Sequence, residues 1–312
     1  MTDLQRAERE ARRETRRRAI RRRRAAAVGG IVVVGGAALA GVALLRSHSP
    51  ATGPVAKVTP AVSSRGVIEH LPSASAFQPL AYASSPARSS VRVPILMYHR
   101  VAPASTGTNA VSRDLTVEPE VFTGQMAWLA ENGFHPITQR ALFESLERGA
   151  ALPTKPVVLT FDDGYVDALT TVLPILKSHH FPATFYVITG RNSQPAFLSW
   201  DQMKRLDAAG MDVGSHTVGH VELTGQSAEG KRVQLERSKR DLEKHLGHPV
   251  YWFCYPAGRF DAASVAATKA AGYLLAVTTQ PGSTITSAAP LEAPRVRIHG
   301  PGAISDIGRS LA

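Results

Sequence analysis

Short apolar runs alternate with amphipathic stretches from residue 93 to the C-terminus, and this alternation constrains the fold more than any other feature of the chain. Apolar runs of this kind are typical of buried strands, and longer amphipathic stretches are typical of helices. The pattern predicts strands over 93–98, 157–161, 183–188, 211–214, 250–255 and 273–278, and helices over 166–179, 200–209, 226–246 and 262–271. Because strands that alternate with helices form parallel βα units, we expect one α/β domain over residues 93–312, built as a closed or distorted (β/α) barrel.

Basic charge is concentrated at the N-terminus. Residues 1–24 contain eleven arginines and four acidic residues, so this segment holds +7 of the net charge of +11. The remaining residues share only +4. A basic surface for nucleic acid is therefore not indicated outside this tail, and we expect no nucleic-acid partner.

An uncharged apolar segment, residues 25–45, follows the arginines directly. As a helix it would rise about 31 Å, which is enough to cross the hydrocarbon core of a bilayer. Arginines on the N-terminal side hold that end in the cytoplasm. The sequence thus predicts a single-pass signal-anchor helix, with residues 1–24 as a cytoplasmic tail and the rest of the chain outside the membrane. A cleaved signal peptide, with Ala38-Leu39-Ala40 as the cleavage region, is the open alternative and would give a secreted protein.

Residues 46–92 are rich in Ser, Pro and Ala and show little hydrophobic periodicity, which is typical of a flexible linker. Packing of parts of this segment on the domain, particularly around Val67-Ile68, stays open. Cys254 is the only cysteine, so no disulfide within the chain is possible. Cysteine usage therefore does not indicate a compartment. The oligomeric state stays open at this point.

Polar side chains follow three of the predicted strands at their C-terminal ends, and in a barrel these ends meet on one face. The motifs are Asp162-Asp163, His216 with His220, and Tyr255-Pro256. Asp-Asp-Gly alone is typical of a turn, and two histidines four residues apart are a weak metal signal. One Asp with two His is nevertheless a common ligand set for a divalent ion with open positions, and an adjacent carboxylate can act as a base. Their joint occurrence predicts a hydrolytic metal site.

The same segments resemble the motifs of a known family. Residues 160–165, 215–220 and 253–258 are similar to the first three motifs of the polysaccharide deacetylases with a NodB-homology domain, also called carbohydrate esterase family 4. The resemblance extends over roughly residues 94–298. It implies a deformed (β/α) barrel and metal-dependent hydrolysis of acetyl groups from sugars.

The resemblance also implies a role for individual residues. Asp163, His216 and His220 would bind Zn²⁺ or another divalent ion such as Co²⁺. Asp162 would be the catalytic base. The backbone N–H of Tyr255 would donate to the oxyanion, a role in which loss of one donor can cost roughly 2.7–4 kcal/mol.

Two histidines are candidates for the general acid that protonates the leaving amine. Residues 95–99 match a motif of the family's circularly rearranged branch, in which the histidine corresponding to His99 lies at the active site. Ile298-His299-Gly300 is similar to the C-terminal Leu-x-His-Asp motif, with Gly in place of Asp. We favour His99, and His299 is the alternative.

The chain departs from the family pattern at Cys254, where many relatives have an arginine that orients the base. Arg259 and Arg295 are the candidates to replace that arginine in space. Cys254 itself is predicted to be a small buried residue beneath the site, and a role as an additional metal ligand stays open. The sequence also has no clear Asp-x-x-Asp-Trp motif, the fourth of the family.

We therefore expect a membrane-anchored, extracytoplasmic deacetylase that acts on an N-acetylglucosamine-containing polysaccharide such as peptidoglycan, an exopolysaccharide or a chitin-like chain. Two alternatives stay open: an O-acetyl esterase of the xylan type on the same fold, and a non-catalytic carbohydrate-binding relative. A glycosidase is disfavoured, because Asp162 and Asp163 are adjacent and do not give the roughly 5–9.5 Å carboxyl separation that glycoside hydrolysis needs.

Overall fold

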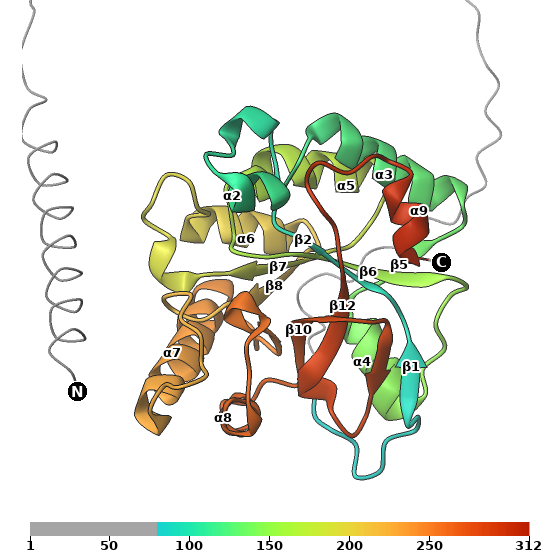
Figure 1. The fold of residues 1–312 in the computed structure, drawn as a ribbon. Coiled ribbons are helices and arrows are strands. Elements are labelled where there is room, and N and C mark those ends of the chain that lie inside the picture. The colour runs from blue at the N-terminus through green and yellow to red at the C-terminus, as the bar shows by residue number, and fades with distance from the viewer. Residues whose placement is uncertain (1–79, 312) are drawn as a thin grey trace, which may run out of the picture. The chain divides into compact units, whose positions relative to one another are not determined.

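Seven parallel strands lie side by side in chain order and close on themselves where β2 pairs with β6 (Figure 1). The computed structural model describes residues 80–311. The barrel strands are β2 (Ile95–Tyr98), β6 (Pro156–Phe161), β7 (Thr184–Val187), β8 (Asp212–Ser215), β9 (Trp252–Cys254), β10 (Leu275–Pro281) and β12 (Ala293–Arg297). Every neighbouring pair is parallel. All seven C-terminal ends therefore open on one face, as the predicted (β/α) barrel requires.

Helices cover the outside of the barrel, and polar caps begin several of them. Ser199, Ser227 and Asp261 each accept a hydrogen bond from the backbone N–H three residues on, which satisfies one free donor at the start of α6, α7 and α8. The helices are α2 (Ala110–Asp114), α3 (Pro119–Glu131), α4 (Gln139–Arg148), α5 (Leu173–Ser178), α6 (Trp200–Ala208), α7 (Ala228–Leu246), α8 (Ala262–Ala270) and α9 (Asp306–Leu311).

The six predicted strands are all present, with boundaries shifted by one to three residues. The helix predicted over 166–179 is divided into a π-helical turn, Ala168–Val172, and α5. Pro174 explains the division, because it lacks the N–H of a continuous helix and lies in the first turn of α5. Strand β12 was not predicted, since its sequence contains a proline and two arginines instead of an apolar run.

Short elements complete the domain. A two-residue strand, β5 (His135–Pro136), pairs with the start of β6, and β3 (Arg100–Val101) pairs with β4 (Thr116–Val117). The remaining elements are the short strands β1 (Ser90–Arg92) and β11 (Thr284–Thr286) and the 3₁₀ turns Ala104–Thr106, Thr189–Arg191, Pro256–Gly258 and Pro290–Glu292.

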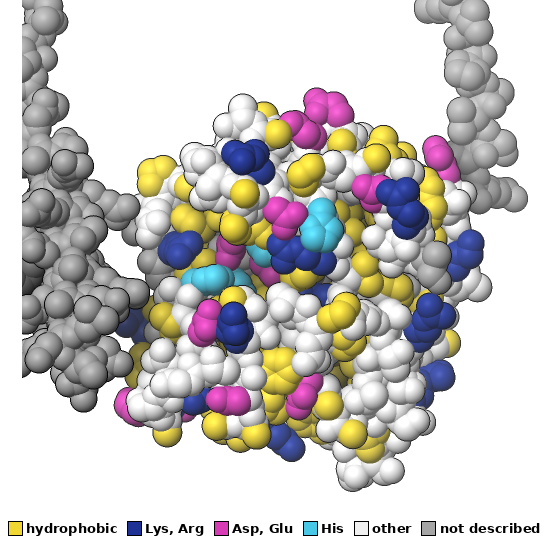
Figure 2. Space-filling model, in the orientation of Figure 1, with side chains coloured by type: hydrophobic (Ala, Val, Ile, Leu, Met, Phe, Trp, Pro, Cys, Tyr) yellow, Lys and Arg dark blue, Asp and Glu magenta, His cyan; other side chains and the backbone are white. Residues whose placement is uncertain are grey.

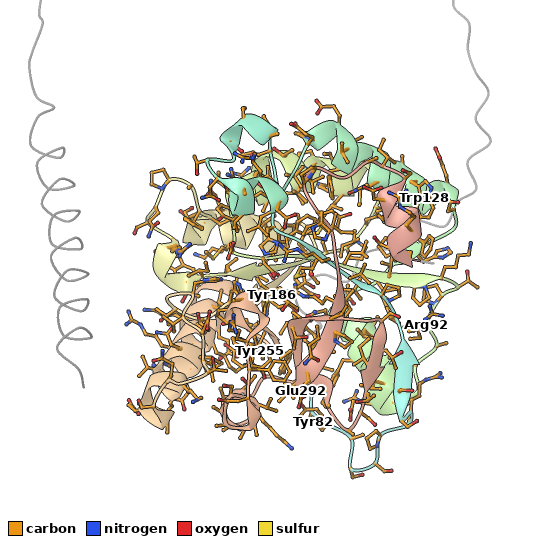
Figure 3. The ribbon with its side chains drawn as sticks, viewed as in Figure 1. Tyr82, Arg92, Trp128, Tyr186, Tyr255 and Glu292 are labelled. Carbon is orange, nitrogen blue, oxygen red and sulfur yellow. The ribbon has the colours of Figure 1, made fainter. Side chains whose placement is uncertain are left out.

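Residues 80–92, the last part of the predicted linker of residues 46–92, pack on the barrel. Strand β1 pairs antiparallel with β11, and the Tyr82 hydroxyl donates to the Leu274 carbonyl at 2.8 Å. Tyr82 lies beside Glu292 (Figure 3). Both residues line a cavity of about 280 Å³. The contacts of Tyr82 and the backbone pairing of β1 fix this segment on the barrel, although its composition is typical of a linker.

Within residues 80–311, no helix is long and apolar enough to cross a membrane. The predicted cytoplasmic tail, the predicted transmembrane helix and residues 46–79 of the predicted linker lie outside the described part of the chain.

Candidate active site

Asp163, His216 and His220 meet at the C-terminal face of the barrel, after β6 and β8. The Asp163 Oδ1 atom lies 3.6 Å from His216 Nε2 and 3.4 Å from His220 Nε2. One donor atom from each residue falls within 4.8 Å of the other two. A carboxylate and two imidazole nitrogens at this spacing suit a divalent ion such as Zn²⁺. The predicted ligand set is thus brought together by the fold.

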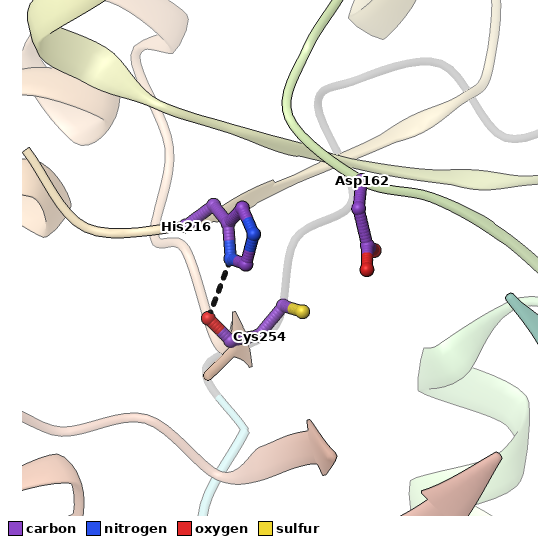
Figure 4. A group of neighbouring side chains, drawn as sticks. All are labelled: Asp162, His216 and Cys254. Carbon is purple, nitrogen blue, oxygen red and sulfur yellow. Dashed lines mark hydrogen bonds between the residues drawn. The ribbon is translucent and has the colours of Figure 1, made fainter. Parts of the chain in front are cut away.

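A hydrogen bond fixes the orientation of the His216 ring. Its Nδ1 lies 2.7 Å from the Cys254 carbonyl oxygen (Figure 4). This carbonyl accepts only, so Nδ1 is the protonated nitrogen and Nε2 keeps its lone pair towards Asp163. Burial lowers the pKa of His216 to about 4. The ring is therefore neutral at pH 7, as a metal ligand must be.

Tight loops hold the ligands in place. Asp163 adopts a left-handed backbone conformation with φ of 73°, and Gly164 follows it with φ of 75°. A Cβ atom at Gly164 would lie 2.9 Å from the Val187 side chain, so the turn requires glycine there. In the His216–His220 loop, the Gln234 side chain accepts from two successive backbone N–H groups at 3.1 and 2.9 Å. Helix α7, which contains Gln234, thereby fixes the loop.

Asp162 lies next to the triad and forms a buried, two-point ion pair with Arg295 of β12. Arg295 Nη1 donates to Asp162 Oδ1 at 2.8 Å, and Nη2 donates to Oδ2 at 2.7 Å. Burial alone would raise the pKa of Asp162, but the charge and hydrogen bonds of Arg295 hold it well below its ordinary value. The carboxylate is therefore ionised at neutral pH, the state that a base needs.

Arg295 takes the place of the arginine that was expected at position 254. The alternative, Arg259, is exposed and pairs with Glu222 at 3.4 Å. The Cys254 Sγ atom lies 3.3 Å from Arg295 Nη2, on the Asp162 side of β9 (Figure 4). Burial raises the pKa of this thiol well above its ordinary value, and its sulfur lies against the Arg295 guanidinium, whose positive charge opposes a metal ion at that place. The interpretation of Cys254 as a small buried residue is therefore the better of the two.

His99, not His299, is the histidine beside the base. Its Nε2 lies 3.8 Å from Asp162 Oδ2, and burial lowers its pKa to about 4. His299 has a side chain that is 61% exposed and pairs with Asp114 at 2.8 Å. The geometry thus favours His99 for proton transfer with Asp162.

Tyr255 does not fit the role of oxyanion donor, which corrects that prediction. Its N–H donates to the Val277 carbonyl at 3.2 Å and so belongs to the pairing of β9 with β10. Pro256 has no N–H. The next N–H is that of Ala257, which has φ of 53° and no hydrogen-bond acceptor among residues 80–311. The sequence did not reveal this donor, because the motif does not show where the strand pairing ends.

In the metal-free protein, we expect stability to fall as the pH is lowered from about 6.5 to about 4. The pKa values of the largely buried His99 and the fully buried His216 are lowered to about 4 by loss of hydration, whereas in the unfolded chain both titrate near 6.5. Between these values the unfolded state binds more protons, so the free energy of unfolding rises with pH, by on the order of 2–3 kcal/mol for each histidine.

Urea unfolding in the presence of a chelator, between pH 4.5 and 7.5, measures this dependence. The variant His99→Gln should show a shallower dependence than the parent. Equal slopes in the two proteins would show that His99 is not held neutral by burial.

Comparison with known proteins agrees with this geometry. Residues 149–276 match the sequence profile of the polysaccharide deacetylases. A Bacillus subtilis protein assigned to that family, YxkH, is 30% identical over 207 residues, which cover 66% of this chain and 71% of YxkH. The chain belongs to the polysaccharide deacetylase family.

Members of the family also share the fold. The Streptococcus pyogenes deacetylase PplD, solved in complex with acetate, is 30% identical with a TM-score of 0.65, and the match covers 71% of this chain and 99% of PplD. The Escherichia coli poly-β-1,6-N-acetyl-D-glucosamine N-deacetylase is 32% identical over 124 residues, which cover 35% of this chain and 18% of that protein. Shorter matches, at 30–34% identity, join the chain to deacetylases of peptidoglycan and of chitin and cover 31–54% of those proteins.

Proposed function

We propose that this polysaccharide deacetylase hydrolyses the N-acetyl groups of an N-acetylglucosamine-containing polysaccharide in a metal-dependent reaction. The observation that supports this most strongly is the triad of Asp163, His216 and His220 directly beside the ion-paired carboxylate of Asp162. Sugar binding alone needs no ionised base next to a ligand set for a divalent ion. The arrangement therefore favours catalysis over the non-catalytic alternative.

Asp163, His216 and His220 would hold the ion, and Zn²⁺ fits one carboxylate with two neutral imidazoles. When bound, such an ion lowers the pKa of a water and polarises the carbonyl that the water attacks. Asp162, ionised because of Arg295, accepts the proton of the attacking water. The Ala257 N–H is the backbone donor that is free to bind the oxyanion.

His99 completes the sequence of proton transfers. It is neutral at rest, because burial lowers its pKa to about 4. The proton that it gives to the leaving amine must therefore be gained during the reaction, and Asp162 is the carboxylate in position to supply it, 3.8 Å away. Asp162 and His99 thus act as one relay from the water to the amine.

The relatives support the substrate class, since they include deacetylases of poly-N-acetylglucosamine, peptidoglycan and chitin. We further propose that the domain acts at the cell envelope, outside the membrane, and that residues 25–45 anchor it there. This rests on the apolar, uncharged character of that segment and on the arginines before it.

Acetate release by the full-length protein tests the proposal. We expect release from N-acetylglucosamine oligomers or peptidoglycan that a chelator abolishes and that Zn²⁺ or Co²⁺ restores. Acetylated xylan serves as the ester control. Release from xylan alone would replace the proposal by the O-acetyl esterase. A folded, metal-loaded protein that releases acetate from none of these substrates would favour the binding relative.

A further inference from the structure

Four planar side chains form a layered stack beside the candidate metal ligands. The rings of Tyr165 and Phe197 stack with centroids 4.9 Å apart and an angle of 22°. The Arg100 guanidinium lies 4.8 Å from the Tyr165 centroid, and that of Arg191 lies 4.9 Å from the Phe197 centroid. Because each ring has one face against the other ring, the two guanidinium groups occupy the outer faces.

The two arginines of the stack differ in their partners. Arg100 pairs with the Asp167 carboxylate at 3.3 Å. Arg191 has no carboxylate within 4 Å and its guanidinium donates no hydrogen bond within residues 80–311. A guanidinium held over an aromatic ring, with donors that the described residues do not use, can bind an anion in a fork-like geometry. Within residues 80–311, the stack therefore leaves the guanidinium of Arg191 without a polar partner.

Arg191 is held at the site by the loop that contains two of the candidate ligands. The backbone N–H groups of Thr189 and Gly190 donate to the carbonyls of Thr217 and Val218 at 3.2 and 2.9 Å. A Cβ atom at Gly190 would lie 2.5 Å from the Val218 oxygen, so only glycine permits this approach. The 3₁₀ turn that ends at Arg191 is thus joined directly to the loop of His216 and His220.

The stack also places Arg191 close to the candidate ligands. Its guanidinium lies over Phe197, and the ring of Phe197 stacks on Tyr165, which follows the candidate ligand Asp163 by two residues. Figure 2 shows Lys and Arg side chains beside the histidines on this face. A substrate group that meets Arg191 would therefore belong to the sugar that reacts or to its neighbour.

We propose that Arg191 binds an anionic substituent, a carboxylate or a phosphate, on the glycan next to the acetamido group that is removed. This rests on the proposed function and narrows its substrate class to acidic glycans, such as those with muramic acid units. Each deacetylation leaves an ammonium group on the polymer, which Arg191 repels. A negatively charged sugar unit offsets the repulsion between this ammonium group and Arg191. The site therefore favours glycans that have negative charge before and after deacetylation.

The test compares matched substrates. The first is an oligosaccharide of N-acetylglucosamine and N-acetylmuramic acid, the second is the same molecule with its carboxyl groups reduced to alcohols, and the third carries a phosphate ester instead. Acetate release is measured as kcat/KM at low ionic strength. Affinity is measured by calorimetry with Asp162→Asn, so that binding is read without turnover.

We expect the parent to prefer an acidic over the neutral oligosaccharide by about tenfold or more, as a charge-assisted hydrogen bond implies. If the preference is found with the carboxylate substrate, the group that Arg191 binds is a carboxylate; if it is found with the phosphate ester, the group is a phosphate. Arg191→Gln should lose most of this preference. Arg191→Lys, which keeps the charge but not the planar fork, should retain only the part of the preference that is due to charge. Arg259→Gln, which removes an exposed arginine paired with Glu222, should leave the preference as in the parent.

Several outcomes would overturn the inference. The first is a parent protein that hydrolyses acidic and neutral oligosaccharides equally well. The second is an Arg191→Gln variant whose kcat/KM falls equally on acidic and neutral substrates, because this would give the stack a structural role only. The third is a preference for the acidic substrate that does not fall as salt is raised from about 0.05 to 0.5 M. The salt series needs no variant and so decides the matter even if Arg191→Gln does not fold. Absence of any acetate release would contradict the proposed function alone, because the calorimetric preference still tests Arg191.

Discussion

Replacing Asp162 by Asn is expected to lower acetate release by about 10²–10⁴-fold, the usual contribution of a positioned general base. The amide keeps the size of the side chain but has no charge with which to accept the proton of the attacking water. Steady-state acetate release measures the loss, on whichever N-acetylated substrate the parent hydrolyses. Metal content should stay close to that of the parent, because the candidate ligands are Asp163, His216 and His220.

The control for this experiment is Asp201→Asn. Asp201 lies in the first turn of α6 and its side chain is 91% exposed. We expect activity within about twofold of the parent, since the effect of an exposed helix carboxylate is small. If Asp162→Asn, with metal bound, retained more than about a tenth of the parent rate, another group would have to be the base.

The sequence was sufficient to predict the elements that depend on local pattern. The strands before Asp162 and His216 are short and wholly or largely buried, so their apolar runs identify them and place the polar residues at their ends. The alternation with helices then fixes parallel order, and parallel order brings the motifs to one face. The candidate ligand set follows from these two steps.

The part of the site that depends on distant pairing could not be predicted in the same way. Arg295 meets Asp162 across 133 positions of sequence, from a strand whose own pattern is not that of a buried strand. The Tyr255 prediction was wrong for a related reason, because only the pairing of β9 with β10 shows that its N–H is already bonded to Val277. Hydrogen bonds between residues far apart in the sequence determine the role of Arg295 and of the Tyr255 N–H. A sequence motif gives no information about such bonds.

Replacing Arg295 by Met is expected to destabilise the protein by about 3–5 kcal/mol near pH 7, because it leaves the Asp162 carboxylate buried without a counter-ion. Arg295 is 1% exposed and Asp162 is 3% exposed. Chemical denaturation of the metal-free protein measures the change. The matched control is Arg297→Met, two residues along β12. Arg297 pairs with Asp114 at 2.6 Å, but both side chains are more than a third exposed, so we expect a loss of about 0–1 kcal/mol.

The pH dependence separates loss of the ion pair from loss of packing. In the parent, the lowered pKa of Asp162 means that its contribution to stability is present above its unfolded pKa of about 4 and disappears as the pH falls through the folded value. In Arg295→Met the buried carboxyl has a raised pKa, so its destabilising effect grows as the pH rises above about 4. The difference between the two proteins should therefore be larger at pH 7 than at pH 4.5.

A double variant, Asp162→Asn with Arg295→Met, removes both charges from the barrel. It should be more stable than Arg295→Met alone, because no uncompensated charge is left buried. A double variant as unstable as the single one would mean that the arginine stabilises the barrel by filling space rather than by neutralising the base. Recovery of stability in the double variant would mean that the arginine is kept to neutralise Asp162: the barrel accepts a buried arginine on β12 so that Asp162 stays ionised beside the attacking water.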